Sequence, residues 1–136
     1  MVVDSSFVVA LMVAEEHSPF AERIMDTEAD VGLEAPMLIG WELANVLQTK
    51  VRRGQLSTED RRRLLGRLEE LPVLLHPATT TPELRAVAEL CDRRGLTAYD
   101  AAYLALGLQL GAPLATLDAR LAKAARAEGL AVHCPF

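Results

Sequence analysis

Short apolar runs alternate along the chain with longer segments whose apolar residues recur at helical spacing. The runs have the length of buried strands and are bounded by Gly, Pro or polar residues. They cover residues 2–3, 31–35, 73–75, 114–116 and 131–132. The periodic segments predict helices over residues 5–14, 19–25, 37–53, 57–71, 81–94, 97–110 and 119–128. This alternation predicts an α/β domain with a parallel sheet and helices on both faces.

Composition favours one self-sufficient domain over residues 1–136, because no repeat, low-complexity segment or linker divides the chain. Hydrophobic residues make up 51% of it, enough for a substantial core without disulfides. Cys91 and Cys134 match no metal or redox spacing and are expected to be free thiols. No apolar stretch reaches the roughly 20 residues of a membrane span, and the start lacks a basic leader. We therefore expect a soluble, cytoplasmic protein with no membrane partner.

The net charge of −5, from 14 basic and 19 acidic residues, argues against a protein that coats nucleic acid. The two signs are unevenly spread, however. A dense basic stretch lies in the middle of the chain and comprises Lys50, Arg52, Arg53, Arg61, Arg62, Arg63 and Arg67. Taken alone, this stretch is most simply a solvated helix face.

Four acidic residues stand among apolar neighbours, whereas most of the others lie in polar runs. They are Asp4, Glu42, Asp100 and Asp118. Asp4 has a local interpretation as a turn or cap before the first helix, and Asp118 as the cap of the last. Asp100 follows Thr97 at the spacing of a capping box, where an acid also suits the helix dipole.

Glu42 is harder to explain locally, because it is expected well inside its helix and beyond any cap. On a helical wheel it shares a face with Leu38, Ile39, Asn45 and Val46. A glutamate on the buried side of a helix, beside an asparagine, favours a role in a site.

Topology makes the four acids more informative together than apart. Ligands of open parallel sheets bind beyond the carboxyl ends of the strands. Asp4 and Asp118 directly follow predicted strands, and Glu42 and Asp100 lie in helices that can flank that edge. We expect Asp4 beside Asp118, in one pocket with Glu42 and Asp100. Converging carboxylates repel one another unless a cation neutralises them, and oxygen ligands without Cys or His favour Mg²⁺ or Mn²⁺. Such a site suits the cleavage of phosphodiesters.

At these residues the sequence resembles the PIN domain family, and more narrowly the VapC-like toxins of prokaryotic toxin–antitoxin pairs. The resemblance spans essentially the whole chain, and its four motifs occur in the family's order. They are Val2-Val3-Asp4-Ser5-Ser6, Trp41-Glu42-Leu43-Ala44-Asn45-Val46-Leu47, Leu96-Thr97-Ala98-Tyr99-Asp100-Ala101-Ala102-Tyr103-Leu104-Ala105-Leu106 and Leu114-Ala115-Thr116-Leu117-Asp118.

The resemblance implies a three-layer α/β/α domain with a five-stranded parallel sheet in the order 3-2-1-4-5. It also implies a metal-dependent endoribonuclease that acts on structured RNA such as tRNA or ribosomal RNA. The implied metal-binding set is Asp4, Glu42, Asp100 and Asp118, with Thr116 as the family's hydroxyl residue and Ser6 as a candidate supporting donor. A small VapB-like antitoxin and a homodimer are the implied partners.

The expected mechanism is hydrolysis of an RNA phosphodiester with one or two Mg²⁺ or Mn²⁺ ions. Asp4 and Asp100 are the preferred direct ligands, while Glu42 and Asp118 bind directly, bind through water or orient the nucleophile. The arginine stretches are candidates for phosphate contacts. Aromatic residues make up only 4% of the chain, which predicts no stacking platform and favours recognition by shape.

Rival functions fit the sequence less well. His17, His76 and His133 are scattered, with no partner acid at useful spacing. A phosphoacceptor receiver domain needs an acidic pair near the first strand and a late lysine at a strand end, but Asp4 stands alone. A haloacid-dehalogenase-like phosphatase needs a second Asp at the position of Ser6. The alternative from another class is a non-catalytic module that binds RNA or a protein.

Overall fold

The computed structural model of the protein describes residues 1–14, 16–28, 30–77 and 80–136. Within these residues, five strands form one sheet, and neighbouring strands pair in parallel. The strands are β1 (Val2–Val3), β2 (Leu33–Pro36), β3 (Val73–His76), β4 (Leu114–Ala115) and β5 (Val132–His133). Their order is β3-β2-β1-β4-β5, so the predicted topology is confirmed.

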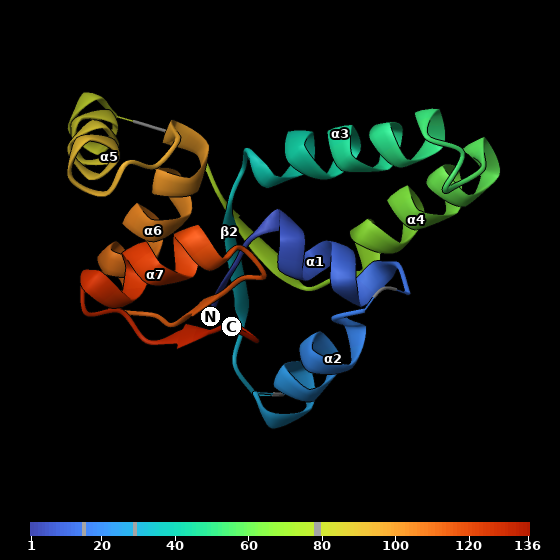
Figure 1. The fold of residues 1–136 in the computed structure, drawn as a ribbon, viewed down its shortest axis with the longest axis horizontal. Helices are drawn as coiled ribbons and strands as arrows, with labels where there is room; N and C mark the ends of the chain where they lie inside the picture. The colour runs from blue at the N-terminus through green and yellow to red at the C-terminus, as the bar shows by residue number, and fades with distance from the viewer. Residues whose placement is uncertain (15, 29, 78–79) are drawn as a thin grey trace.

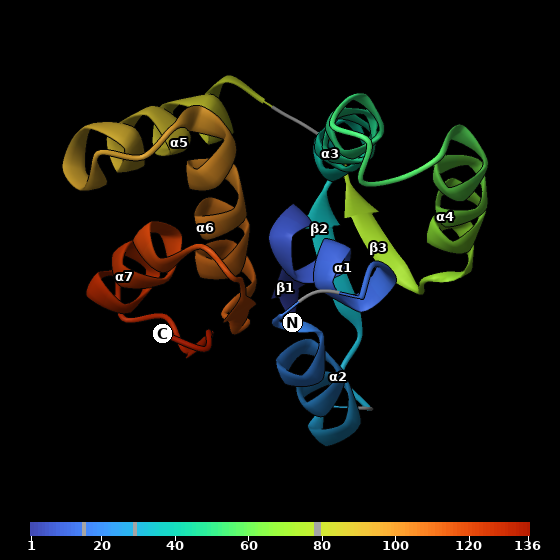
Figure 2. The ribbon, with the colours of Figure 1, turned by 45° about the vertical axis from the view of Figure 1, so that its right-hand side comes forward.

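Helices cover both faces of this sheet, as Figure 1 and Figure 2 show. On one side lie α5 (Thr81–Arg94), α6 (Ala98–Leu110) and α7 (Ala119–Ala127). On the other lie α1 (Ser5–Met12), α2 (Ser18–Thr27), α3 (Ile39–Arg52) and α4 (Thr58–Glu70). The three-layer α/β/α architecture is therefore confirmed.

The central strand β1 brings two distant parts of the chain into register. Val3 is paired with Ala115 of β4, and the backbone N–H of Asp4 donates to the Ala115 carbonyl at 3.2 Å. Each strand ends at this point. The residues that follow β1 and β4 therefore begin side by side at the same edge of the sheet.

The core sits around these central strands. Val2, Val3 and Leu114 are fully buried, as are Phe7 of α1 and Leu104 of α6. Burying side chains of this size stabilises the fold by about 1.5–3 kcal/mol each. The core therefore fixes both helices against β1 and β4, the strands that position the site. Within the described part of the chain, no helix is long and apolar enough to cross a bilayer.

Several element ends differ from the expected ones by a few residues. The helix predicted from residue 37 begins at Ile39, because Pro36 pairs with His76 in the sheet and Met37 donates its N–H to the His76 carbonyl. This shift places Glu42 in the first turn of α3. The prediction that Glu42 lies well inside its helix was therefore wrong.

Candidate active site

Asp4 is a nearly buried carboxylate between β1 and α1, with 5% of its surface exposed. It is the N-cap of α1, and its Oδ1 accepts the Phe7 backbone N–H at 2.9 Å. The Ser6 hydroxyl donates to the same oxygen at 2.7 Å, and the Thr116 hydroxyl donates to Oδ2. The local prediction of a cap is therefore correct, and the hydrogen bonds hold the carboxylate in one orientation.

Thr116 and Ser6 connect Asp4 to the turn that carries Asp118. Thr116 is fully buried, and its Oγ1 accepts the Asp118 backbone N–H at 2.9 Å. The Ser6 Oγ accepts the Leu117 backbone N–H at 2.8 Å. Both hydroxyls, which the sequence placed in supporting roles, thus bridge segments more than one hundred residues apart.

Asp118 caps α7, as its local interpretation predicted. Its Oδ1 accepts the backbone N–H groups of Arg120 at 2.7 Å and Leu121 at 3.1 Å. No hydrogen bond among the described residues involves its Oδ2. The cap therefore fixes the side chain and leaves one oxygen for another partner.

Asp4 and Asp118 also interact electrostatically. Burial raises the pKa of Asp4 above its ordinary value, against the lowering effect of the hydrogen bonds from Thr116, Ser6 and Phe7. The negative charge of Asp118 raises this pKa further. A carboxylate of this kind is stabilised by a nearby cation.

Glu42 is held by a residue that the sequence did not single out. The hydroxyl of Tyr103, a residue 1% exposed in α6, donates to Glu42 Oε2. Burial raises the pKa of Tyr103 well above its ordinary value, and the hydrogen bond with Glu42 raises it further, so the phenol remains a donor. The signal was available, since Tyr103 lies three residues after Asp100 and hence on the same helical face.

Asp100 also acts on Tyr103 through its charge. Its Oδ2 accepts the Thr97 hydroxyl at 2.8 Å, and its backbone N–H donates to the Thr97 Oγ1 at 3.1 Å. The negative charges of Asp4 and Asp100 both raise the pKa of Tyr103. Tyr103 therefore lies within the electrostatic reach of three of the four predicted acids.

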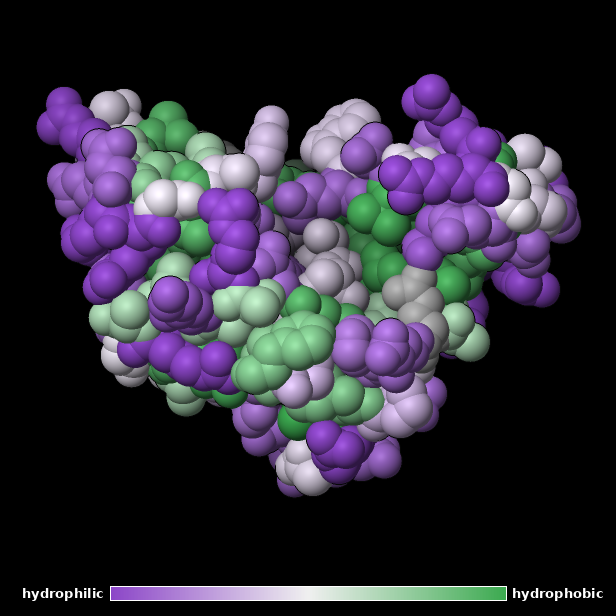
Figure 3. All heavy atoms as spheres, in the orientation of Figure 1, coloured by the Kyte–Doolittle hydropathy of each residue, from purple (hydrophilic) through white to green (hydrophobic). Residues whose placement is uncertain are grey.

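The four acids converge on one edge of the sheet without forming a ready coordination shell. Across the described residues, no three Asp, Glu, His or Cys side chains lie close enough to hold a metal ion. Figure 3 shows the surface indented between the two helix groups at this edge. The donor set, carboxylate oxygens with no Cys or His, fits a hard divalent cation.

Asn45 does not join this arrangement. It is exposed on α3, and no hydrogen bond among the described residues links it to the acids. Two histidines have acid partners that the sequence did not indicate, because the partners are distant in the chain: His76 pairs with Glu34 at 2.7 Å, and His133 lies 3.6 Å from Glu28. Neither pair includes one of the four acids.

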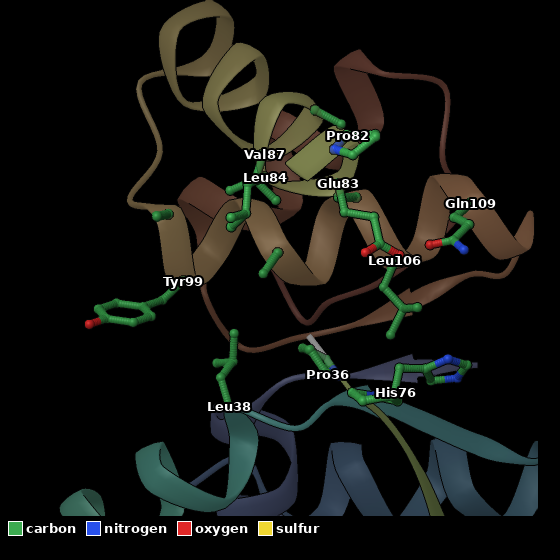
Figure 4. Close-up of a pocket in the computed structure, with 15 residues that line it drawn as sticks. Pro36, Leu38, His76, Pro82, Glu83, Leu84, Val87, Tyr99, Leu106 and Gln109 are labelled. Carbon is green, nitrogen blue, oxygen red and sulfur yellow. The ribbon is translucent and has the colours of Figure 1, made fainter. Parts of the chain in front are cut away.

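An apolar groove of about 670 Å³ lies beside the acids rather than around them. Figure 4 shows its walls, formed by α5 and α6 on one side and by Pro36, Leu38 and His76 on the other. None of its lining residues is one of the four acids. The pocket expected to contain all four is therefore not this groove.

The basic stretch extends away from the acids along α3 and α4. Ten residues of helix, or about 15 Å, separate Glu42 from Arg52. Arg52 and Arg53 are exposed, while Arg63 is paired with Asp60 of its own helix at 2.8 Å. The exposed arginines are therefore placed to meet a long ligand beyond the acids rather than at them.

Replacing Thr116 with Val is expected to lower the free energy of unfolding by about 1–3 kcal/mol. Val has nearly the same shape, but it leaves the buried Asp118 N–H without its acceptor and Asp4 Oδ2 without its donor. Urea denaturation measures the effect. Thr116→Ser keeps both hydrogen bonds and should lose only a buried methyl group, about 0.8 kcal/mol. A Val variant as stable as the wild type would contradict this role.

The fold and the position of the acids place the protein among the open parallel α/β domains. These domains bind their ligands beyond the carboxyl ends of the strands. The PIN domain family model matches residues 1–127, and the chain belongs to this family. It is similar to Ribonuclease VapC3 of Pyrobaculum aerophilum, with 37% identity over 123 residues, covering 90% of this chain and 92% of that protein.

Two solved structures share the fold. PAE2754 from Pyrobaculum aerophilum has a TM-score of 0.69 and 26% identity, over 96% of this chain and 81% of its own. VapBC2 from Rickettsia felis, bound to a DNA fragment from their promoter, has a TM-score of 0.69 and 13% identity, over 98% of this chain and 96% of its own.

Proposed function

We propose that this protein is a metal-dependent endoribonuclease and the toxin of a VapC-like toxin–antitoxin pair. The observation that carries the proposal is the nearly buried Asp4, held beside Asp118 at the carboxyl edge of the sheet, in a chain of the PIN domain family. The similarity to Ribonuclease VapC3 supports RNA as the substrate.

The residues that would hold Mg²⁺ or Mn²⁺ are Asp4 and Asp118, with Glu42 and Asp100 from the flanking helices. A bound ion supplies a more acidic water and neutralises charge that develops on the phosphoryl group. Asp4 Oδ2 accepts a hydrogen bond from Thr116 alone among the described residues. An oxygen with two lone pairs therefore retains one for a cation.

In this proposal, the residues that are hydrogen-bonded to the acids have distinct roles. Thr116 and Ser6 orient Asp4, and the α7 cap orients Asp118. Tyr103 holds one oxygen of Glu42, leaving the other to face a ligand. Such partners of metal ligands set both their direction and their basicity.

Replacing Tyr103 with Phe is expected to reduce metal-dependent RNA cleavage by roughly 10–100-fold. The ring and its packing remain, but Glu42 loses the donor that fixes it. The measurement is cleavage rate together with Mn²⁺ affinity, and circular dichroism verifies the fold. Tyr99→Phe, four residues earlier on an exposed position, is the matched control. Equal cleavage rates in the wild type and Tyr103→Phe would show that the Tyr103 hydroxyl does not contribute to the site.

The proposed partners follow from the resemblance to VapC-like toxins. They are a VapB-like antitoxin, a second copy of the chain in a homodimer, and a structured RNA such as tRNA or ribosomal RNA. An RNA substrate of this kind makes the cytoplasm the proposed location. Arg52 and Arg53, exposed at the far end of α3, are the proposed contacts for phosphates distant from the cleaved bond.

One observation favours the alternative, a non-catalytic module that binds RNA or a protein. Within the described residues, no three acids are close enough to hold an ion. That arrangement is also expected of a site whose mutual repulsion separates the carboxylates until a cation binds. Activity therefore decides between the two functions.

The test is cleavage of purified tRNA and ribosomal RNA with Mg²⁺, with Mn²⁺ and with EDTA. The proposal predicts discrete fragments only when metal is present. Hydrolysis by water leaves no cyclic phosphate at the fragment ends, which separates this activity from metal-independent contaminating ribonucleases. Binding of RNA without cleavage under any metal condition would favour the non-catalytic module.

A further inference from the structure

Two of the chain's few aromatic residues are exposed directly beside the site. Trp41 is 83% exposed and precedes Glu42, and Tyr99 is 65% exposed and precedes Asp100. Trp41 is the only tryptophan, and Tyr99 is one of two tyrosines. Although the aromatic content of the chain is low, the position of these two residues determines which ligands they can contact.

The two aromatics come from the two helices that carry Glu42 and Asp100. Trp41 belongs to the first turn of α3 and Tyr99 to the first turn of α6. The hydrogen bond from Tyr103 of α6 to Glu42 of α3 links these two helices. Each aromatic directly precedes an acid of the site in its helix, so the two Cα atoms are about 3.8 Å apart.

Tyr99 and Leu38 both line the apolar groove. Figure 4 shows Tyr99 at one end of this groove, with its ring directed outward, and Leu38 facing α6 from the opposite wall. Trp41 is one turn from Leu38, to whose carbonyl it donates its backbone N–H at 3.0 Å. Tyr99 of α6 therefore lines the groove, and Trp41 of α3 lies one turn from a residue that lines it.

We infer that Trp41 and Tyr99 stack on unpaired bases that flank the cleaved phosphodiester. The inference rests on the proposed function. A phosphate held at the acids carries its two neighbouring nucleotides past the residues next to those acids. Stacking on an aromatic ring works with any base and adds no charge to a site that already repels phosphate.

The only tryptophan allows a direct test. In the Asp4→Asn protein, a short single-stranded oligoribonucleotide is expected to quench Trp41 fluorescence in a saturable manner, whereas a fully paired duplex is not. In the same background, Tyr99→Ala should weaken binding roughly 10-fold, and Tyr99→Phe should restore it. Phe136→Ala, which removes an exposed aromatic outside the site motifs, should leave binding unchanged.

Cleavage by the otherwise unmodified protein provides the second measurement. Trp41→Ala and Tyr99→Ala are expected to raise KM for an RNA cleaved in an unpaired loop by about 10-fold, with a smaller change in kcat. Unchanged KM in both variants, or RNA binding without quenching, overturns the stacking and assigns the exposed pair to a protein partner. Absence of both RNA binding and cleavage overturns the proposed function itself.

Discussion

Replacement of Asp4 with Asn is expected to reduce RNA cleavage by about 100-fold or more and to raise the stability of the metal-free protein at neutral pH. Asn keeps the size of the side chain and an oxygen for Ser6 and Phe7, which donate to Asp4 Oδ1. It removes the negative charge that a divalent cation needs. The same change removes a charge that the fold buries at a cost.

The pH dependence of this stability change has a defined sign. Burial raises the pKa of Asp4 in the folded protein above the ordinary value that it has in the unfolded chain. The folded wild type therefore binds the proton more tightly, and it loses stability as the pH rises from about 4 through the folded-state pKa. The Asn variant has no such loss, so its advantage is absent below about pH 4 and grows as the pH rises above that value.

The measurement is thermal unfolding of both proteins in EDTA over this pH range, alongside cleavage at neutral pH. An advantage of about 1 kcal/mol is expected at pH 7. Asp92→Asn, an exposed aspartate of α5, is the control and should change neither cleavage nor the pH dependence. An Asp4→Asn protein that cleaves RNA at the wild-type rate would exclude Asp4 from catalysis.

Removal of divalent metal is expected to have an equally large effect. EDTA should abolish cleavage, and either Mg²⁺ or Mn²⁺ should restore it, because the donor set consists of hard carboxylate oxygens. Bound metal should also stabilise the fold, because its positive charge offsets the cost of burying the Asp4 carboxylate and the repulsion between Asp4 and Asp118. At a concentration 100 times its Kd, the gain is about 2.7 kcal/mol, or roughly 8 °C in Tm.

Thermal unfolding with and without Mn²⁺ checks this second effect independently of any RNA. The Asp4→Asn protein should gain little or no Tm from Mn²⁺, whereas Asp92→Asn should gain as much as the wild type. Equal gains in wild type and Asp4→Asn would show that the ion binds elsewhere. Cleavage that persists after exhaustive chelation would contradict metal dependence.

The sequence predicted most of the fold because its apolar periodicity is strong and its turns are well marked. The strand order depended on the family resemblance, since apolar runs alone do not determine which strands pair. The observed ends of helices and strands differ from the predicted ends where a residue pairs with a distant segment of the chain. Pro36, for example, is held in the sheet by β3, and this pairing delays the start of α3.

The candidate site was predicted less completely. Asp4, Asp118, Thr116 and Ser6 proved to be hydrogen-bonded together, because each follows or borders a central strand end. Helical periodicity placed Asn45 beside Glu42, but it could not show that Asn45 faces solvent. Tyr103 was missed because a tyrosine in an apolar helix is typical of a core, and only its contact with Glu42 distinguishes it.

The central claim is that four acids from distant segments bind one divalent cation. Calorimetric titration of Mn²⁺ tests it most directly, using wild type and the variants Asp4→Asn, Glu42→Gln, Asp100→Asn and Asp118→Asn. We expect the wild type to bind Mn²⁺ and each variant to bind it at least about 10-fold more weakly. A wild type that binds no Mn²⁺, or four variants that bind it as tightly as the wild type, would contradict the account.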